Sequence, residues 1–400
     1  MLERWPEAKV AIEASATPRS VCLDVGRCKT LVVNGAHLTS KLDRVREAFD
    51  QARLIPYETA EPWIYGVGLG DLPRMLLQRP TVKRLHVVIL SRSITSASFQ
   101  FEPPTWAADP RVELHMAKDV PSPVEPLAVS PIELRYCDED AMRVRDCLTW
   151  IMMSGFVAST TAVLEKIREQ NKAETADLRR ADSHVSELYG TDKRPAIVIM
   201  GGPTLATHYQ WIADRMGDHN IITASTSLQP LARHGIAPNV TIMIDPCPIQ
   251  AKHFDGPARK DGTLVYSTDA HRSVIESWHG RRYHVDTKGG DLELYVAGSV
   301  VHSACDLARR MGAPTVYLVG ADFCYPGGAS HVDGATITTQ TDGAWRPRTR
   351  DGNGAEVTSD NNHLMYRRQL EVYVARHDEV NWRKVDRRGL EVPGMRWVDG

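Results

Sequence analysis

The sequence lacks an excess of charge of either sign. Its 48 Lys and Arg residues nearly balance its 50 Asp and Glu residues, which leaves a net charge of −2. A protein whose main partner is nucleic acid usually carries a clear basic excess. We therefore expect no nucleic-acid partner, and we interpret the arginines at 346, 348 and 350 as either a solvated surface or a small local basic patch.

Paired cysteines and long hydrophobic runs are also missing. The seven cysteines form no CxxC pair, so the sequence predicts reduced thiols and no structural zinc. No run approaches the ~18 apolar residues that a membrane span requires, and residues 2–7 do not resemble a secretory signal. We expect a cytoplasmic protein without a membrane span, of unknown oligomeric state.

The composition that is present is that of a folded protein with more than one domain. Hydrophobic residues make up 42% and charged residues 24% of the 400 positions, a length beyond the roughly 250 to 300 residues that one core usually serves. Strand and helix patterns alternate in residues 1–135 and again in 191–400, and residues 136–190 are dense in helix formers. This predicts an α/β chain: a smaller Rossmann-like domain, a helical connector, and a Rossmann-like parallel-sheet domain that holds the site.

The larger domain is predicted from five short apolar runs with helices between most of them. The expected strands are 196–200, 221–224, 240–244, 264–267 and 316–319. The expected helices are 205–216, 228–234, 300–311 and 363–376.

A glycine turn follows the first of these strands. Gly201, Gly202, Pro203 and Thr204 separate the strand from the next expected helix. Two glycines allow a ligand close to the backbone, and free N–H groups at a helix start favour a phosphate. A plain tight turn is the alternative. If the turn binds a nucleotide, a bulky residue at Gly202 should abolish binding and leave the fold intact.

Polar residues directly follow three further expected strands. Because the carboxyl ends of parallel strands meet at one edge of a sheet, these residues are expected to lie close together. A second glycine step precedes the helix at 300–311 and offers another phosphate-capable helix start. The residues concerned are Ser225, Thr226, Asp245, Gly298, Ser299 and Asp322. The sequence thus predicts a ligand site at the carboxyl edge.

Several spaced segments of this core carry a family resemblance. They are GGPTL at 201–205, HGIAPNVTIMIDP at 234–246, AGSVVHSACDLARRMGAPTVYLVGADFCY at 297–325 and ASHVDG around His331. Together they resemble the motility accessory factor (Maf) flagellin glycosyltransferases, and the same core resembles 6-hydroxymethylpterin diphosphokinase-like (MptE-like) proteins. Residues 64–90 resemble the Maf N-terminal domain.

The core is also similar, more distantly, to bacterial sialyltransferases, and this likeness implies residue roles. Gly202, Pro203 and Thr204 match the nucleotide-binding turn, and Gly298 with Ser299 matches the second glycine turn. Ser225 and Asp245 match two nucleotide-contacting positions, although Asp replaces Asn at 245. The catalytic histidine of that family has no secure counterpart, since its position falls near Asn361, beside His363.

The resemblance implies a transferase that moves a nonulosonic (sialic-acid-like) sugar from a CMP-activated donor, its substrate, to a Ser or Thr hydroxyl of a protein such as flagellin. The catalytic candidates are His331, His363 and Asp245, and Tyr325 is expected to bind the phosphate. A diphosphokinase-like transfer from ATP is the alternative, with Asp245 and Asp322 holding Mg²⁺. A non-catalytic nucleotide-binding homologue is the third reading. Outside the diphosphokinase alternative, no metal or other cofactor is expected.

Two further expectations concern segments outside this core. Gly66, Gly68 and Gly70 form a GxGxG after a strand, but the next strand leads into Ser91 where a ribose-binding carboxylate is wanted. We expect the first domain to be a scaffold that binds neither S-adenosylmethionine nor a dinucleotide. The segment 326–362 is too long for a simple connection, so it is predicted to be either a lid or a disordered insertion.

Overall fold

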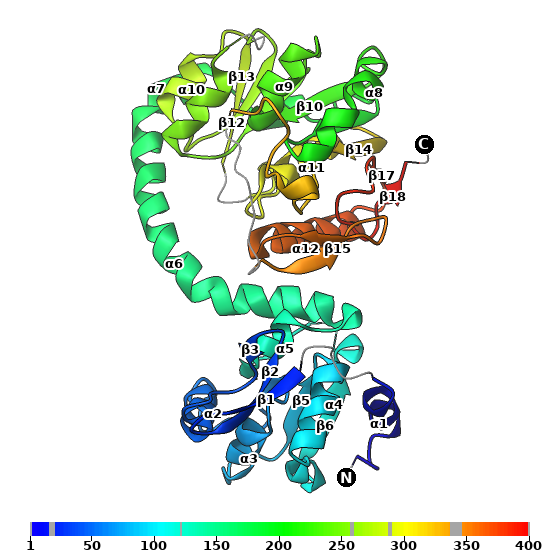
Figure 1. Ribbon diagram of the computed structural model, residues 1–400. Helices are drawn as coiled ribbons and strands as arrows, with labels where there is room; N and C mark the ends of the chain where they lie inside the picture. The colour runs from blue at the N-terminus through cyan, green and yellow to red at the C-terminus, as the bar shows by residue number, and fades with distance from the viewer. Residues whose placement is uncertain are drawn as a thin grey trace. The chain divides into compact units, whose positions relative to one another are not determined.

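The computed structural model divides into two compact units, Met1–Met152 and Met153–Gly400 (Figure 1). It describes residues 2–15, 21–120, 122–256, 260–286, 290–336 and 346–398, and the side chains of 153–163 are outside the description. The boundary between the units falls inside the longest described helix, α6 (Met142–Glu174).

The first unit is built on a parallel sheet with the strand order β6-β5-β4-β7. Its strands are β4 (Trp63–Tyr65), β5 (Leu85–Ile89), β6 (Val112–Met116) and β7 (Leu127–Val129). A separate antiparallel sheet holds β1 (Val21–Val25), β2 (Lys29–Val33) and β3 (Ala36–His37). The helices of this unit are α1 (Pro6–Glu13), α2 (Arg44–Ala52), α3 (Asp71–Leu77), α4 (Arg92–Phe101), α5 (Pro131–Arg135) and the short turns η1 (Thr105–Ala108), η2 (Ala117–Asp119) and η3 (Glu139–Ala141).

Strand β5 shows why this sheet forms, because all five of its residues are buried. Leu85 and Val87 pack in a cluster with residues of α1, α2 and α3, whereas Val88 packs in another cluster with residues of α5 and α6. Successive residues of a strand point to opposite faces, so a strand covered on both sides must be apolar throughout.

The second unit is a nine-stranded sheet in which every pairing is parallel. Its strands are β8 (Ser183–His184), β9 (Ala196–Ile199), β10 (Asn220–Ala224), β11 (Val240–Met243), β12 (Thr263–Ser267), β13 (Arg281–Val285), β14 (Thr315–Val319), β17 (Asn381–Lys384) and β18 (Arg396–Trp397). Every residue of β9 to β12 is buried. The predicted Rossmann-like parallel-sheet fold is confirmed.

Helices cover both faces of this sheet. Ala196 and Val198 pack on the side of α11 (Val300–Met311) and α12 (Asn361–Arg376), while Ile197 and Ile199 pack on the side of α8 (Tyr209–Ala213) and α9 (Leu228–Arg233). The remaining helical elements are α7 (Ala176–Ala181), α10 (Arg272–Glu276), η4 (Val185–Leu188), η5 (Pro203–Thr207), η6 (Ser225–Ser227), η7 (Pro248–Phe254) and η8 (Pro326–Gly328).

The strand order is β18-β17-β14-β9-β10-β11-β12-β13-β8, and it places a topological switch point beside β9. From β9 the chain adds β10 to β13 in one direction, and it then crosses to add β14, β17 and β18 on the other side. Ligands of open parallel sheets bind at the carboxyl ends of the strands next to such a point. The ends of β9 and β14 therefore mark where a site is expected.

One helix differs from the sequence prediction, and the segment 326–362, for which the lid stays a prediction, contains a hairpin. The helix predicted at 205–216 is instead the 3₁₀ turn η5 followed by the short α8, since the residues after the glycine turn pack against β14 rather than continuing one helix. Within 326–362, an antiparallel hairpin pairs β15 (Arg348–Arg350) with β16 (Glu356–Thr358), and residues 337–345 lie outside the described residues. Across the described helices, none combines the length and the apolar character needed to span a bilayer.

Candidate nucleotide site

Two adjoining pockets lie at the carboxyl edge of the nine-stranded sheet. The large pocket, of about 620 Å³, follows the ends of β10 and β11. The small pocket, of about 300 Å³, follows the ends of β9 and β14. Both are lined by Thr226, Ser299 and Val300, so the start of α11 stands where they meet. The combined space is in the range of small-molecule sites.

The structure brings most of the predicted site residues to these two pockets. Ser225, Thr226, Asp245, Gly298 and Ser299 line the large pocket. The small pocket is lined by Gly201, Gly202, Thr226, Ser299, Asp322, Tyr325, His331 and His363. Pro203 and Thr204 line neither of them. The predicted contacts with a ligand remain predictions.

The first glycine turn is held by the protein itself. The Gly202 N–H donates to the Gly320 carbonyl at 2.8 Å, and the Thr204 N–H donates to Asp322 Oδ2 at 3.0 Å. The Thr204 hydroxyl also donates to Asp322. The expectation of free N–H groups at this turn is therefore wrong for these two amides. A side chain at Gly202 would overlap the Gly320 carbonyl, so a bulky residue there would disturb the fold as well as the pocket.

Asp322 is buried, with 4% of its surface exposed, and Lys384 is buried beside it. Burial raises the pKa of the Asp322 carboxyl, although Lys384 and Thr204 act in the opposite direction. Burial likewise lowers the pKa of Lys384 to about 8. The Lys384 ammonium donates to the carbonyls of Ala321 at 2.8 Å and Leu390 at 2.6 Å. These contacts tie the loop after β14 to β17 and to the glycine turn.

The second glycine turn differs from the first. Gly298 has a φ of +87°, and an added Cβ would lie 2.6 Å from Cε1 of Tyr366, so both conformation and space require glycine. Ser299 is the N-cap of the 12-residue helix α11, and its side chain makes no capping hydrogen bond. The positive end of a helix dipole thus faces the junction of the pockets, which suits a phosphate.

His302 holds this helix start in place. Its Nδ1 lies 2.9 Å from the Ser299 carbonyl and its Nε2 lies 2.9 Å from the Tyr366 carbonyl, and the side chain is buried. The imidazole therefore connects the first turn of α11 to α12. We assign His302 a structural role.

Three half-buried or buried histidines, His253, His331 and His363, form a group that we call the histidine trio. Burial is the main cause of the lowered pKa of each one. His331 further lowers the pKa of His253, and His363 lowers that of His331, which shows that neighbours in the trio are close. The trio is consequently neutral near pH 7, and its two pocket-lining members, His331 and His363, can each accept a proton.

Tyr325 belongs to a polar group at the rim of the small pocket. Its hydroxyl donates to Asp360, which caps α12 by accepting from the His363 N–H at 2.8 Å. Arg346 donates to the Tyr325 hydroxyl at 3.3 Å, and its guanidinium lies 4.8 Å from the centre of the Tyr325 ring. Arg348, in contrast, is exposed and pairs with Glu356 at 2.9 Å. Of the arginines in this cluster, Arg346 is thus the one beside the site.

Arg168 is the main site residue that the sequence analysis did not identify. It lines the large pocket from α6, with its Nε 3.3 Å from Asp269 Oδ2. Nearby, Asn171 donates to the carbonyls of Pro246 and Asp269, each at 2.8 Å, and so fixes the turn after β11 against α6. The segment 165–180 is rich in charged residues, a composition typical of a solvent-exposed helix, and only the tertiary packing shows that part of it lines a pocket.

Asp245 is held from two sides. Its Oδ1 accepts from the Cys247 N–H at 2.8 Å, and its Oδ2 accepts from Gln250 Nε2 at 3.0 Å. Asp245 lines the large pocket and Asp322 the small one. The pair that would hold Mg²⁺ in the diphosphokinase alternative therefore does not share a pocket, and Asp322 already accepts two hydrogen bonds from Thr204.

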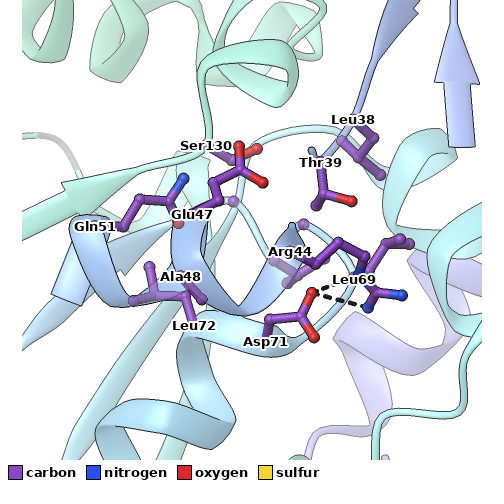
Figure 2. Close-up of a pocket in the computed structure, with 13 residues that line it drawn as sticks. Leu38, Thr39, Arg44, Glu47, Ala48, Gln51, Leu69, Asp71, Leu72 and Ser130 are labelled. Carbon is purple, nitrogen blue, oxygen red and sulfur yellow. Dashed lines mark hydrogen bonds and ion pairs between the residues drawn. The ribbon is translucent and has the colours of Figure 1, made fainter. Parts of the chain in front are cut away.

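The glycine loop of the first unit surrounds a carboxylate of the protein. Gly66, Gly68 and Gly70 all have positive φ, and the Gly68 N–H donates to Glu133 Oε2 at 2.8 Å. Glu133 is fully buried, and burial raises its pKa. The adjacent pocket is about 20 Å³, with Arg44 and Asp71 paired at its edge (Figure 2). That volume suits one water molecule. The expectation that this unit binds neither S-adenosylmethionine nor a dinucleotide stays a prediction.

Comparisons with known proteins agree with the two resemblances noted in the sequence. Residues 164–328 match the family model "6-hydroxymethylpterin diphosphokinase MptE-like". Among solved structures, the chain is similar to the Maf glycosyltransferase from Magnetospirillum magneticum AMB-1, at 15% identity and a TM-score of 0.45, over 99% of this chain and 73% of that one.

A shorter similarity is to spermidine synthase from Thermotoga maritima, at 13% identity and a TM-score of 0.23, over 31% of this chain and 50% of that one. No curated protein matches the sequence. The family match includes the pocket residues from Arg168 to Tyr325 and ends before His331 and His363.

Proposed function

We propose that the protein is a glycosyltransferase that transfers a nonulosonic sugar from a CMP-activated donor to a Ser or Thr hydroxyl of a protein such as flagellin. The observation that carries the proposal is the pair of pockets that share the start of α11. A donor of this kind has a nucleotide and a sugar on either side of one phosphate. Two spaces joined at an anion-favouring helix start match that order.

In this arrangement the nucleotide occupies the large pocket. Ser225 and Asp245 offer polar contacts there, and the Arg168 guanidinium adds positive charge. The phosphate lies at Ser299 and Val300, where the helix dipole stabilises the charge of the departing CMP. The sugar occupies the small pocket beside the histidine trio.

The chemistry follows from those positions. The acceptor hydroxyl oxygen bonds to the anomeric carbon of the sugar, the bond from that carbon to the phosphate oxygen breaks, and the electron pair leaves with CMP. His331 or His363 takes the hydroxyl proton, a role that its lowered pKa permits at neutral pH. Tyr325 lines the same pocket, but its single hydroxyl proton is donated to Asp360, so it can bind the leaving phosphate only if that hydrogen bond breaks.

The second candidate is an ATP-dependent diphosphokinase, which the family match over 164–328 favours by its description. It needs Mg²⁺ beside the transferred phosphates. Asp245 and Asp322 do not fit that requirement, because they line different pockets and Asp322 is bonded to Thr204.

A ligand screen tests the proposal. A ligand that binds only the folded protein raises its melting temperature. We expect CMP, CDP and a CMP-sugar to do so, and ATP with Mg²⁺ to have little effect. The reverse pattern would favour the diphosphokinase. Binding of a nucleotide without turnover would favour the non-catalytic nucleotide-binding homologue, and no response to any nucleotide would contradict all three alternatives.

Turnover of a CMP-nonulosonate with a Ser- and Thr-containing peptide, followed by mass spectrometry, tests the chemistry. We expect His331→Ala or His363→Ala to lower the rate about 100-fold or more with donor affinity retained. His279→Ala, a change at an exposed histidine, is the matched control. Full activity of the double variant His331→Ala/His363→Ala would contradict the assignment.

A further inference from the structure

A cluster of potential metal ligands lies in the first unit, apart from the candidate site. His86 on β5 pairs in register with Glu113 on β6, and His115 follows two residues later on the same face. The His86 Nδ1 is 3.0 Å from His115 Nε2 and 3.5 Å from Glu113 Oε2. One ligand atom from each side chain lies within 4.8 Å of the others.

The contacts of His86 bring the other imidazole and a carboxylate to the same ring nitrogen. Two neutral rings can share one proton between His86 Nδ1 and His115 Nε2. The Glu61 carboxylate lies 4.0 Å from the other nitrogen of His86 and favours the proton there. In that tautomer the lone pair of His86 Nδ1 points to the side where His115 Nε2 lies at 3.0 Å and Glu113 Oε2 at 3.5 Å, and a cation there would replace the hydrogen bond between the rings.

The ring positions are fixed in advance. Trp63 on β4 stacks on His86 with the ring centres 4.1 Å apart and the planes 8° apart, and it stacks on His115 at 5.1 Å. Arg84 pairs with Oε1 of Glu113 at 3.0 Å, so Oε2 is the oxygen turned to the histidines. The Glu113 side chain is 39% exposed, which leaves a path for an ion from solvent.

We propose that His86 Nδ1, His115 Nε2 and Glu113 Oε2 bind one divalent cation of the zinc class. Two imidazoles and one carboxylate form a ligand set that Zn²⁺ accepts, with a water in the fourth position, and that Mg²⁺ and Ca²⁺ disfavour. Tetrahedral bonds of 2.0–2.1 Å place two ligand nitrogens about 3.3 Å apart, so the rings must separate by only a few tenths of an ångström. Glu61 would orient His86 from behind, as carboxylates do for ligating histidines.

The position in the sheet indicates a structural role. His86 and Glu113 are each the second residue of their five-residue strands and His115 is the fourth, so the cluster lies along the strands and not in the loops beyond the carboxyl edge, where ligands of such sheets react. Strand β6 is the outer strand, paired with β5 alone. An ion shared by the two strands would stabilise that outer pairing. The proposal departs from the sequence expectation of no structural zinc, because the ligands come from two strands and include no cysteine.

Zinc binding by the full-length protein tests this proposal. After treatment with a chelator, Zn²⁺ is titrated in competition with a chromophoric chelator. We expect one equivalent at micromolar affinity or tighter, a loss of about 100-fold in His86→Ala and His115→Ala, and about tenfold in Glu61→Gln. The control His279→Ala should bind like the parent. Mg²⁺ at the same concentration should not compete.

A second readout uses the stacked tryptophan. Cu²⁺ bound at the cluster should quench Trp63, so the quenching should be smaller in Trp63→Phe than in the parent. If a histidine variant fails to fold, the half-exposed Glu113→Gln replaces it and should weaken Zn²⁺ at least tenfold. Failure of the native protein to bind one equivalent, or unchanged affinity in a folded ligand variant, would overturn the proposal and leave a histidine–histidine hydrogen bond only.

Discussion

Replacing Asp322 by Ala should destabilise the second unit far more than it changes any ligand contact. The substitution removes two hydrogen bonds from Thr204 to a buried carboxylate, one from its N–H at 3.0 Å and one from its hydroxyl. Hydrogen bonds to charged groups contribute about 1.5–3 kcal/mol each. The buried Lys384 also loses its nearby opposite charge.

The expected loss in the free energy of unfolding is about 3–5 kcal/mol, the range for removing one member of a buried charged pair. For a unit of this size that corresponds to a fall in melting temperature of about 10 °C. Thr204→Val removes only the hydroxyl bond and should cost about 1 kcal/mol. Asp322→Asn keeps an acceptor for the Thr204 N–H and should fall between the two.

Scanning calorimetry, with nucleotide titration on the folded fraction, measures both effects. If Asp322→Ala melts within about 2 °C of the parent while nucleotide affinity collapses, the structural account is refuted and Asp322 is a ligand-binding residue. That result would also restore the diphosphokinase alternative, which needs this carboxylate for Mg²⁺.

Three other changes test the remaining parts of the site. Gly298→Ala should destabilise the protein and weaken nucleotide binding, because the added Cβ would collide with Tyr366. The control is Gly235→Ala, since Gly235 also has a positive φ but has open space around it, so that urea unfolding of this variant measures the conformational strain alone. Arg168→Gln should weaken CMP-sugar binding about tenfold to 100-fold in calorimetric titration, and unchanged affinity would remove it from the site. The histidine trio has a folded pKa below the ordinary 6.5, so the unfolded chain binds more protons in acid. Stability should therefore fall as the pH drops through 6.5, and a triple His→Gln variant should flatten that dependence.

The fold and the position of the site could be predicted because they depend on local patterns. Uninterrupted apolar runs identify buried parallel strands, and parallel strands deliver Ser225 and Asp245 to one edge whatever the details of packing. The helix start at Val300 was predicted to the residue, because Gly298 and Ser299 precede it and Gly312, with a φ of +113°, ends it.

What could not be predicted depends on contacts between distant parts of the chain. Nothing in the sequence near Thr204 shows that its N–H is bonded to a residue 118 positions away. The same is true of Arg168, whose helical segment is too polar to indicate that one side lines a pocket. Residue types and spacing indicate where a backbone group is available, and only the tertiary structure shows whether another residue already uses it.

Glu133 has a consequence for any anion that approaches the first glycine loop. The loop amide of Gly68 already donates to the side-chain carboxylate of Glu133, which belongs to the same chain and is fully buried. A dissolved phosphate competes with a group that cannot diffuse away, and tethered groups act at effective concentrations that free ligands seldom reach. The Gly68 amide is thus already occupied by a carboxylate of the protein itself, and this disfavours the binding of an anion at the loop.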